Sequence, residues 1–289
     1  MAKRILLQTT ISFTDEDWHI DRFHYLAQHL ASLKDDSGYA LYDIVTRNRE
    51  PNVEGTDPIL STLDDRDFDQ LWLFALDMGD GLSADDSQGI IRFHQRGGGV
   101  LTTRDHNDMG CSLLALGDIG ASHYFHTNNP DPDATRNQRD DIYTVRIDYP
   151  NYHSGANGDF QQIKAVADHE LLLRPDGTSI EFFPSHPHEG AVGSNSAFSQ
   201  VVATSKSKVS GREFNLLVAT ERREDGNDNM LGRAIAQSSF HHLVDYNWNV
   251  HAGCPGFVEE TPGDQFEREP EKLNDIKQYA ENAAKWLSS

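Results

Sequence analysis

The chain has 289 residues and is acidic, with 46 Asp and Glu against 25 Lys and Arg and a formal net charge of −21 with His neutral. This charge argues against nucleic acid or an anionic membrane as a partner, because both need a basic face. No stretch approaches the roughly 20 apolar residues of a membrane-spanning helix, and the apolar run 5–7 is too short for a signal peptide. Two cysteines give no disulfide framework, so we expect a soluble protein of the reducing cytoplasm.

Strand and helix patterns alternate through the first 120 residues. Trp18, Leu26 and Leu30 recur at helical spacing after the first apolar run. Thr14 and Ser83 each stand three residues before an Asp, a pattern typical of a helix N-terminus. Strands joined by single helices imply right-handed crossovers and a parallel sheet. The strands predicted here cover residues 5–9, 39–45, 71–76 and 100–103.

The middle of the chain, residues 122–210, is rich in Asn, Asp, Pro and Gly. Such a composition favours loops over long helices or strands. We interpret this segment as a loop-rich insertion with a few antiparallel strands, at 143–147 and 179–183, and not as a separate domain. The insertion would cover the ligand pocket as a lid or form a subunit contact in a homo-oligomer.

The alternating pattern resumes after the insertion. Strands are predicted at 214–219 and 234–236, and the chain closes with a helix that begins near Pro270 and carries an apolar stripe. The order of elements predicts one α/β domain over residues 1–289, built on a doubly wound, mostly parallel sheet.

Ionisable side chains follow several of the predicted strands. Open parallel sheets bind ligands at the carboxyl ends of their strands, so we expect these side chains on one rim of the sheet. His106 follows the strand at 100–103, and His241 follows the last strand; either is a candidate general base or acid. Asp105 or Glu221 is the candidate carboxylate that orients the imidazole.

Other polar residues at the same strand ends are candidates for binding the substrate. Arg104 would hold an anionic or hydroxyl group, and Asp77, Thr10 and His242 complete the set. His241 and His242 are adjacent, and neighbouring residues of an extended chain point to opposite faces. At most one of the two can therefore face a given pocket.

The 14 histidines also raise the question of a metal. A metal site needs three or four converging nitrogen or oxygen ligands, and the sequence shows no tight ligand motif such as HExxH. A bound divalent metal would convert histidines from acid or base to ligands. His123 and His126 are expected to be structural, because an extended Tyr-Phe pair separates them. The candidate ligands are His106, His186, His188 and His241.

Cys111 allows two interpretations. It stands at a predicted helix start with His106 nearby, which suits a nucleophilic thiolate. The alternative is a small apolar residue that begins a buried helix. Cys254 lies in a turn without a neighbouring base and is interpreted as incidental.

Four stretches of the chain resemble the ThuA-like (trehalose utilisation) proteins of the class I glutamine amidotransferase-like superfamily. They cover about two-thirds of the chain and read DQLWLFALDMGDGLSADDSQGIIRFHQRGGGVLT, VRIDYPNYHSGANGDF, FNLLVATE and GRAIAQSSFHHLVDYNW. The resemblance implies a flavodoxin-like, glutamine amidotransferase-like sheet and a link to sugar metabolism. It also puts His241 or His242 at the position of the family's histidine.

The sequence departs from this superfamily at the residues that carry glutaminase chemistry. Amidotransferases have a cysteine on a Gly-x-Cys-x-Gly elbow after the fourth strand, where this chain has residues 104–106, Arg-Asp-His. The segment 186–189, His-Pro-His-Glu, has one residue more than their His-Pro-Glu, and His153 precedes Ser154 where ThuA-like proteins have His-Pro. Glutaminase activity through that cysteine is therefore not expected.

Two functions remain open from the sequence. The first is an enzyme of the hydrolase or lyase type that acts on a small polar, sugar-like metabolite at the rim of the sheet. The second is a non-catalytic ligand-binding or assembly protein that kept the fold without the elbow cysteine, since a fold by itself does not define a function.

Overall fold

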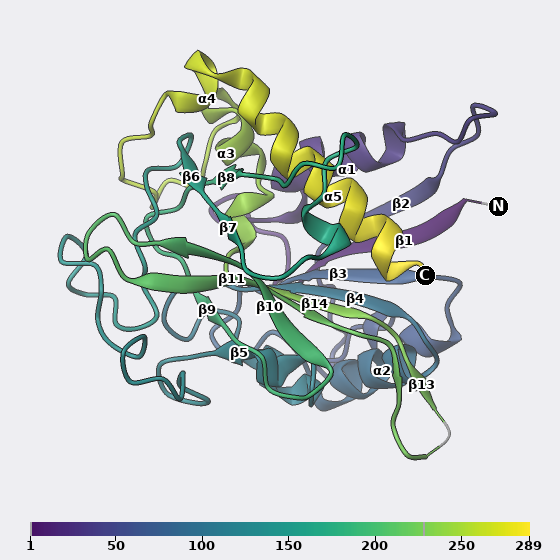
Figure 1. Cartoon of the computed structure of the whole chain (residues 1–289). Coiled ribbons are helices and arrows are strands. Elements are labelled where there is room, and N and C mark those ends of the chain that lie inside the picture. The colour runs from purple at the N-terminus through teal and green to yellow at the C-terminus, as the bar shows by residue number, and fades with distance from the viewer. Residues whose placement is uncertain (1, 228) are drawn as a thin grey trace.

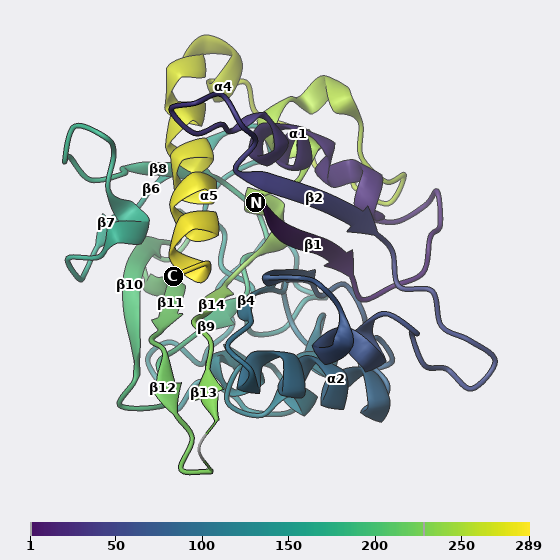
Figure 2. The ribbon, with the colours of Figure 1, turned by 90° about the vertical axis from the view of Figure 1, so that its right-hand side faces the viewer.

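A computed structural model describes residues 2–227 and 229–289 and shows an α/β fold built on an eight-stranded mixed sheet between helical layers (Figures 1 and 2). The strand order is β2-β1-β3-β4-β14-β11-β10-β7. The first five strands of this order run parallel. They are β2 (Tyr42–Arg47), β1 (Lys3–Thr9), β3 (Gln70–Phe74), β4 (Gly99–Thr103) and β14 (Ala234–Gln237), close to the predicted ranges.

The other three strands of the sheet are antiparallel, which corrects the expectation that the parallel pattern continues to the end. They are β11 (Glu213–Thr220), β10 (Ser199–Lys206) and β7 (Lys164–Ala165). An apolar run such as β11 fits either direction, and its connection decides. A short turn joins β10 to β11 as a hairpin, with Ser205 opposite Phe214. β10 itself lies inside the segment interpreted as an insertion, yet it belongs to the main sheet.

Alternating side chains divide the parallel strands between two cores. Ile5, Leu7 and Trp72 point to the face covered by α1 (His24–Ser32) and α5 (Leu273–Leu287). Leu6, Leu71, Leu73 and Val100 point to the opposite face, where α2 (Ala84–Gln95) packs (Figure 2). The strands are buried on both faces, as expected for the centre of a parallel sheet.

The helix predictions had mixed outcomes. Ser83 caps α2 with a complete capping box, its side chain accepting from the Asp86 amide, as predicted. The C-terminal helix is confirmed as a 3-10 turn from Pro270 followed by α5. The prediction at Thr14 was wrong: 3-10 helix η1 (Ile20–Phe23) leads into α1.

The segment between β5 (His123–Tyr124) and β10 consists mainly of loops, gathered at the carboxyl ends of the parallel strands (Figure 1). The strand predicted at 143–147 was wrong, since these residues form turns. The strand predicted at 179–183 is displaced to β8 (Phe182–Pro184). The segment's other strands are β6 (Phe160–Gln162), which pairs with β8, and β9 (Ala191–Val192), which pairs with β5.

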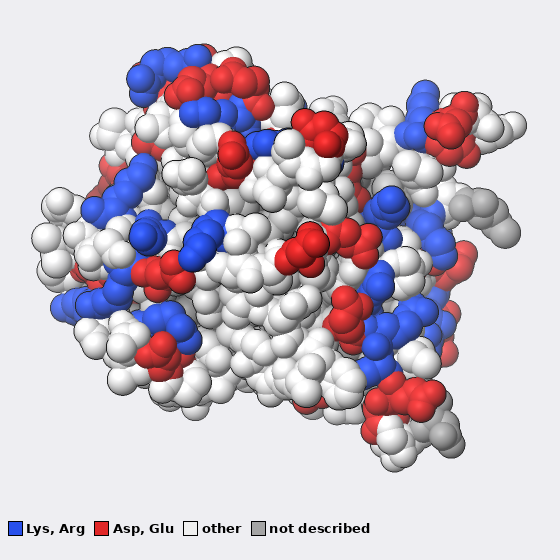
Figure 3. All heavy atoms as spheres, in the orientation of Figure 1, with Lys and Arg blue, Asp and Glu red and all other residues white. Residues whose placement is uncertain are grey.

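Short elements complete the chain. Among the described residues, none of the helices has the length and apolar character to cross a membrane. Acidic and basic side chains are interspersed over the face in Figure 3. The short elements are η2 (Leu60–Asp65), η3 (Cys111–Leu116), η4 (Gly120–Ser122), η5 (Glu170–Leu172), β12 (Arg223–Glu224), β13 (Met230–Leu231), η6 (Phe240–His242), α3 (Asp245–Trp248), η7 (Val250–Ala252), α4 (Gln265–Arg268) and η8 (Pro270–Lys272).

Candidate functional site

A cavity of about 420 Å³ lies where the chain leaves β4 and β14. Asp105 and His106 reach it from the end of β4, and His241 from η6, which follows β14. A larger groove of about 850 Å³ lies beside α5, but no histidine lines it. The smaller cavity is lined by Trp18, Asp105, His106, Asn107, Met109, Arg146, Ile147, Asn157, His186, His188, His241, Phe257, Val258 and Glu260.

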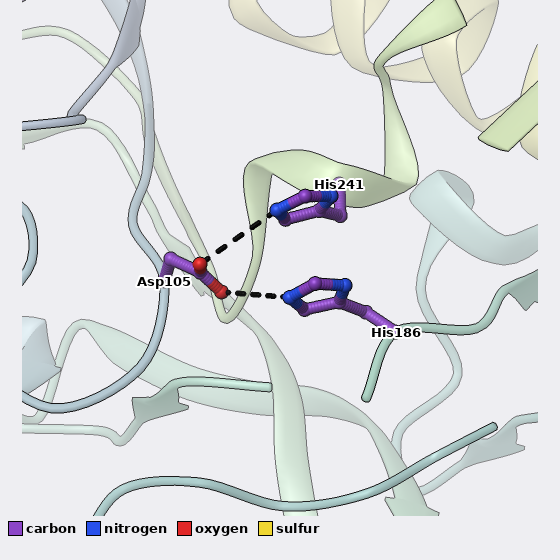
Figure 4. A group of neighbouring side chains, drawn as sticks. All are labelled: Asp105, His186 and His241. Atoms are coloured by element: carbon purple, nitrogen blue, oxygen red, sulfur yellow. Dashed lines mark ion pairs between the residues drawn. The ribbon is translucent and has the colours of Figure 1, made fainter. Parts of the chain in front are cut away.

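Asp105 is the centre of the polar wall. Its Oδ2 accepts a hydrogen bond from Nδ1 of His106 at 3.0 Å and lies 3.7 Å from Nε2 of His241. Its Oδ1 lies 3.2 Å from Nε2 of His186. Figure 4 shows the two imidazole rings of His186 and His241 one above the other, both facing the carboxylate. One buried carboxylate thus faces three imidazoles, and the structure brings Asp105, His106 and His241 together as expected from the sequence.

The histidine rings beside Asp105 are held by their surroundings. The ring of His186 stacks on that of His241 at 3.5 Å between centroids and 9° between planes. Trp18 meets His241 edge-on at 4.8 Å. The Nδ1–H of His186 donates to Oδ1 of Asn157 at 2.9 Å, which leaves Nε2 with a free lone pair.

Burial sets the protonation of this group. Burial lowers the pKa of His186 well below its usual range and also lowers that of His241, against the attraction of Asp105. Burial alone would raise the pKa of Asp105, but His186 and His106 hold it well below its usual range. The imidazoles around Asp105 therefore favour the ionised form of its carboxyl group.

His188 and Glu260 form the part of the lining next to His106 and His186. Nε2 of His188 lies 3.1 Å from Oε1 of Glu260, and its Nδ1 lies 3.0 Å from Oδ1 of Asn151. The hydrogen bond from His188 lowers the pKa of Glu260 to about 2. Both ring nitrogens of His188 thus face oxygen acceptors, so both partners hold the orientation of the ring.

His242 is a correction to the predicted substrate-binding set. Its side chain is fully buried behind the cavity, where Nε2 donates to Oε1 of Glu189 at 2.9 Å. Gln237 Nε2 donates to its Nδ1 at 2.9 Å. The predicted division of the pair is confirmed, with His241 toward the cavity and His242 away from it.

Arg104 is a second correction, because its guanidinium points away from the cavity. It donates to the carbonyl oxygen of Tyr124 at 2.6 Å and to that of Asn107, and it lies over the ring of Phe125. Burial lowers its pKa to about 10. The side chain ties the loop after β4 to β5 and so positions Asp105 and His106.

Three further predicted residues lie outside the cavity lining. Glu221 follows β11, and because β11 runs antiparallel to β14, its end lies at the start of β14. There Glu221 pairs with Arg233 at 3.2 Å. Thr10 Oγ1 accepts from the Leu76 amide at 2.9 Å, and Asp77 accepts from Ser112 Oγ at 2.8 Å, so both brace loops.

The cysteines and the remaining histidines also lie outside it. Cys111 begins the 3-10 helix η3, and burial and the nearby Asp77 raise its pKa, which opposes thiolate formation. His123 is fully buried and bonded to Thr102 Oγ1 at 2.8 Å, as the structural interpretation expected, whereas His126 lies on an exposed loop. Cys254 is free and lies outside the cavity lining.

Several lining residues were missed from the sequence. Glu260 and Asn157 come from loops with no periodic pattern, and their approach to the histidines depends on tertiary structure alone. Trp18 belongs to the buried core, but it precedes η1 and also forms a wall of the cavity, which its helical spacing does not indicate. The spacing of His186 and His188, two residues apart, was the one signal available for this side of the site.

No family model matches the chain, and no relative was found among curated proteins. Solved structures do match. The N-terminal domain of mmIFT52 is 12% identical, with a TM-score of 0.52 over 99% of this chain and 97% of that one. A ThuA-like protein from Parabacteroides merdae is 12% identical, with a TM-score of 0.47 over 100% and 91%. The glutaminase domain of Trypanosoma brucei CTPS with bound acivicin is 12% identical, with a TM-score of 0.45 over 100% and 97%.

Likeness at this level of identity concerns the fold alone. The structural neighbours include both groups that the sequence resembles, a ThuA-like protein and a glutaminase domain. What the structure itself shows is an α/β fold built on an eight-stranded mixed sheet. The chemistry has to be argued from the residues of the cavity.

Proposed function

We propose that this chain is an enzyme of the hydrolase or lyase type that acts on a small polar, sugar-like substrate in the cavity, without a cysteine nucleophile. The observation that carries the proposal is the pair formed by Asp105 and His106. Asp105 is almost fully buried, whereas the His106 side chain is 22% exposed at the cavity. A buried carboxylate behind a partly exposed imidazole is the arrangement that orients a general base.

The geometry of the pair assigns the proton. Asp105 Oδ2 accepts from Nδ1 of His106, so Nε2 carries the lone pair. Over the described part of the chain, Nε2 of His106 has no hydrogen-bond partner, which leaves it free for a substrate hydroxyl or a water. His106 would take a proton from that group and return it to the leaving group, and this serves hydrolysis and elimination alike.

The lining agrees with a small polar substrate. A volume of about 420 Å³ lies within the range of small-molecule sites. Trp18 and Phe257 offer apolar faces for the ring of a sugar, while Asn157 and the histidines offer polar contacts. Arg146, on an exposed loop, is the one cationic side chain other than histidine in the described lining, and it would favour an anionic or electron-rich group at the mouth.

Finer features of the chain belong to the same proposal. The parallel strands follow the order β2-β1-β3-β4-β14, which supports a flavodoxin-like assignment for that half of the sheet. Free Cys111 and Cys254 support a reducing, cytoplasmic location. Arg146, Ile147, Asn157, His186 and His188 reach the cavity from the loop-rich segment 125–198, which supports a lid role for their loops.

The test is a thermal-shift screen with sugars, keto-sugars and sugar acids, followed by NMR detection of turnover for each ligand that raises Tm. We expect His106→Gln to lower kcat by about 100-fold or more, within the range of general acid–base catalysis, with little change in ligand-induced Tm shift. His126→Gln, on an exposed loop, is the matched control and should keep full activity. A ligand that binds but is never converted would instead support the non-catalytic alternative.

A further inference from the structure

We infer that Asp105, His186 and His241 form a binding site for one divalent ion of the first transition row, such as Zn²⁺ or Co²⁺. The three residues offer one ligand atom each, and these atoms lie within 4.8 Å of one another. The inference deepens the proposed function and rests on it for the ion's chemical role, but ion binding itself can be tested separately.

The first argument is an unfavourable contact that a cation would relieve. Because Nδ1 of His186 donates to Asn157, the Nε2 that lies 3.2 Å from Asp105 Oδ1 is itself an acceptor. Neither atom has a hydrogen-bond partner among the described residues, and both are buried. Two buried acceptors at this distance repel each other unless positive charge lies between them.

The second argument is that the imidazole of His241 also has a buried nitrogen without a hydrogen-bond partner. Its side chain is 4% exposed, and its Nδ1 is buried without a hydrogen-bond partner among residues 2–227 and 229–289. Its Nε2 faces Asp105 Oδ2 at 3.7 Å, too far for a hydrogen bond. Buried polar groups almost always have hydrogen-bond partners. An imidazole nitrogen without one, next to the facing acceptors of His186 and Asp105, therefore points to a ligand.

The donor set indicates which ion fits. Two imidazole nitrogens and one carboxylate oxygen suit Zn²⁺, Fe²⁺ or Co²⁺, whereas Mg²⁺ and Ca²⁺ prefer oxygen ligands alone. Three protein ligands leave coordination positions open for water or a substrate oxygen, and the cavity provides the space for it. His186 and His241 stack almost parallel, so binding requires one ring to turn until both lone pairs point at the ion.

Asp105 can serve both parts of the site at once. Its Oδ2 holds His106 while its Oδ1 faces His186. When bound, the ion would act as a Lewis acid toward a substrate hydroxyl or carbonyl. Asn157 would fix the ring of His186, in the way that partners behind metal-bound histidines fix their tautomer.

The test uses the full chain without an affinity tag, dialysed against chelator and titrated with Co²⁺ while visible absorbance is recorded, then with Zn²⁺ in competition. We expect one equivalent of Co²⁺, displaced by Zn²⁺ and not by Mg²⁺. Asp105→Asn and His241→Gln should each weaken binding by at least about 100-fold, the upper end of the effect of losing a residue behind a metal ligand. His251→Gln, whose side chain is 79% exposed, is the matched control and should bind as the wild type does.

The outcomes separate this inference from the proposed function. Binding of less than one equivalent of Co²⁺ by the wild type overturns the metal site. So does undiminished Co²⁺ binding by the Asp105→Asn variant when that variant has a native melting curve. If the wild type binds no Co²⁺ and still converts substrate in the presence of chelator, the metal site is also overturned, but the enzyme assignment stands. Stoichiometric Co²⁺ binding that the two variants abolish supports the site even if no substrate is converted.

Discussion

Two histidine–carboxylate groups lie back to back in this molecule and differ in how their polar atoms are satisfied. His242 pairs with Glu189, whose oxygens accept from His242, Ser154, Gln161 and Ser238. The neighbouring residue His241 faces Asp105, where Asp105 Oδ1 has no hydrogen-bond partner in the described chain. The same residue types therefore build a closed network on one side of η6 and an open one on the other.

The difference separates a structural role from a functional one. Each hydrogen bond to a buried charge stabilises the fold, whereas a buried polar group without a partner costs free energy. Glu189 connects both histidine segments, because Ser154, which donates to it, also accepts from the His186 amide at 2.8 Å. The network around Glu189 thus holds the group around Asp105 in place. A ligand that binds to the Asp105 group would offset the free-energy cost of its unpartnered polar atoms.

The largest effect is expected for Glu189→Gln. The substitution removes the charge that the buried donors from His242, Gln161 and a serine face, and it places an NH₂ group against the donors of either Oε1 or Oε2, so we expect a loss of about 3 kcal/mol in the free energy of unfolding. Urea unfolding measures this loss. Glu213→Gln, at a half-exposed position with a 4.0 Å ion pair, is the control and should change stability by less than about 0.5 kcal/mol. Similar curves for the two variants would contradict the distinction between closed and open groups.

A smaller effect is expected from acid, through buried histidines outside the cavity. Burial lowers the pKa of His123 to about 3 and that of His94 to about 4. The pKa of each histidine in the folded state lies below its value in the unfolded chain, which is near 6.5. The folded state is therefore at its full stability above about pH 6.5 and loses stability as the pH falls from there toward the folded pKa. At pH 5 each histidine should cost about 2 kcal/mol relative to pH 7.5.

The measurement is the difference between urea midpoints at pH 7.5 and pH 5 for the wild type and His123→Gln. The variant should lose about 2 kcal/mol less between the two pH values, whatever its stability at pH 7.5. An unchanged difference would mean that acid acts through other groups, and the cavity histidines would be the next to test.

The smallest effect on stability is expected for Asp105→Asn in the presence of chelator. The substitution removes one hydrogen bond with His106 but also relieves the contact between two acceptors at His186, so we expect a change below about 1 kcal/mol. Urea unfolding beside Glu189→Gln gives the comparison directly. A loss as large as that of Glu189→Gln would show that Asp105 is a structural carboxylate.

Much of the parallel half of the fold was predictable from local patterns. Apolar runs predicted β1 and β3, the alternation of strands and helices predicted β4, and the Ser83 capping pattern predicted the start of α2. The antiparallel half was not, since the direction of β11 depends on the hairpin with β10 and not on its own residues. Short strands such as β6 and β9 have too few residues to show a period.

The site was predicted in part for the same reason. The rule that strand ends gather at one rim placed Asp105, His106 and His241 together. It misplaced Glu221, because the rule holds only for strands that run parallel. It also could not separate Arg104, which turns back to hold loop carbonyl groups, from its neighbour Asp105.

The sequence by itself determined the elements that depend on neighbours along the chain: the buried strands, the capped helix, the alternation of His241 and His242, and the absence of an elbow cysteine after β4. The tertiary structure decided which polar atoms find partners. Glu260 reaches His188, and Asn157 reaches His186, from loops far away in the chain. Whether a buried carboxylate is satisfied depends on such distant donors, and no local pattern encodes them.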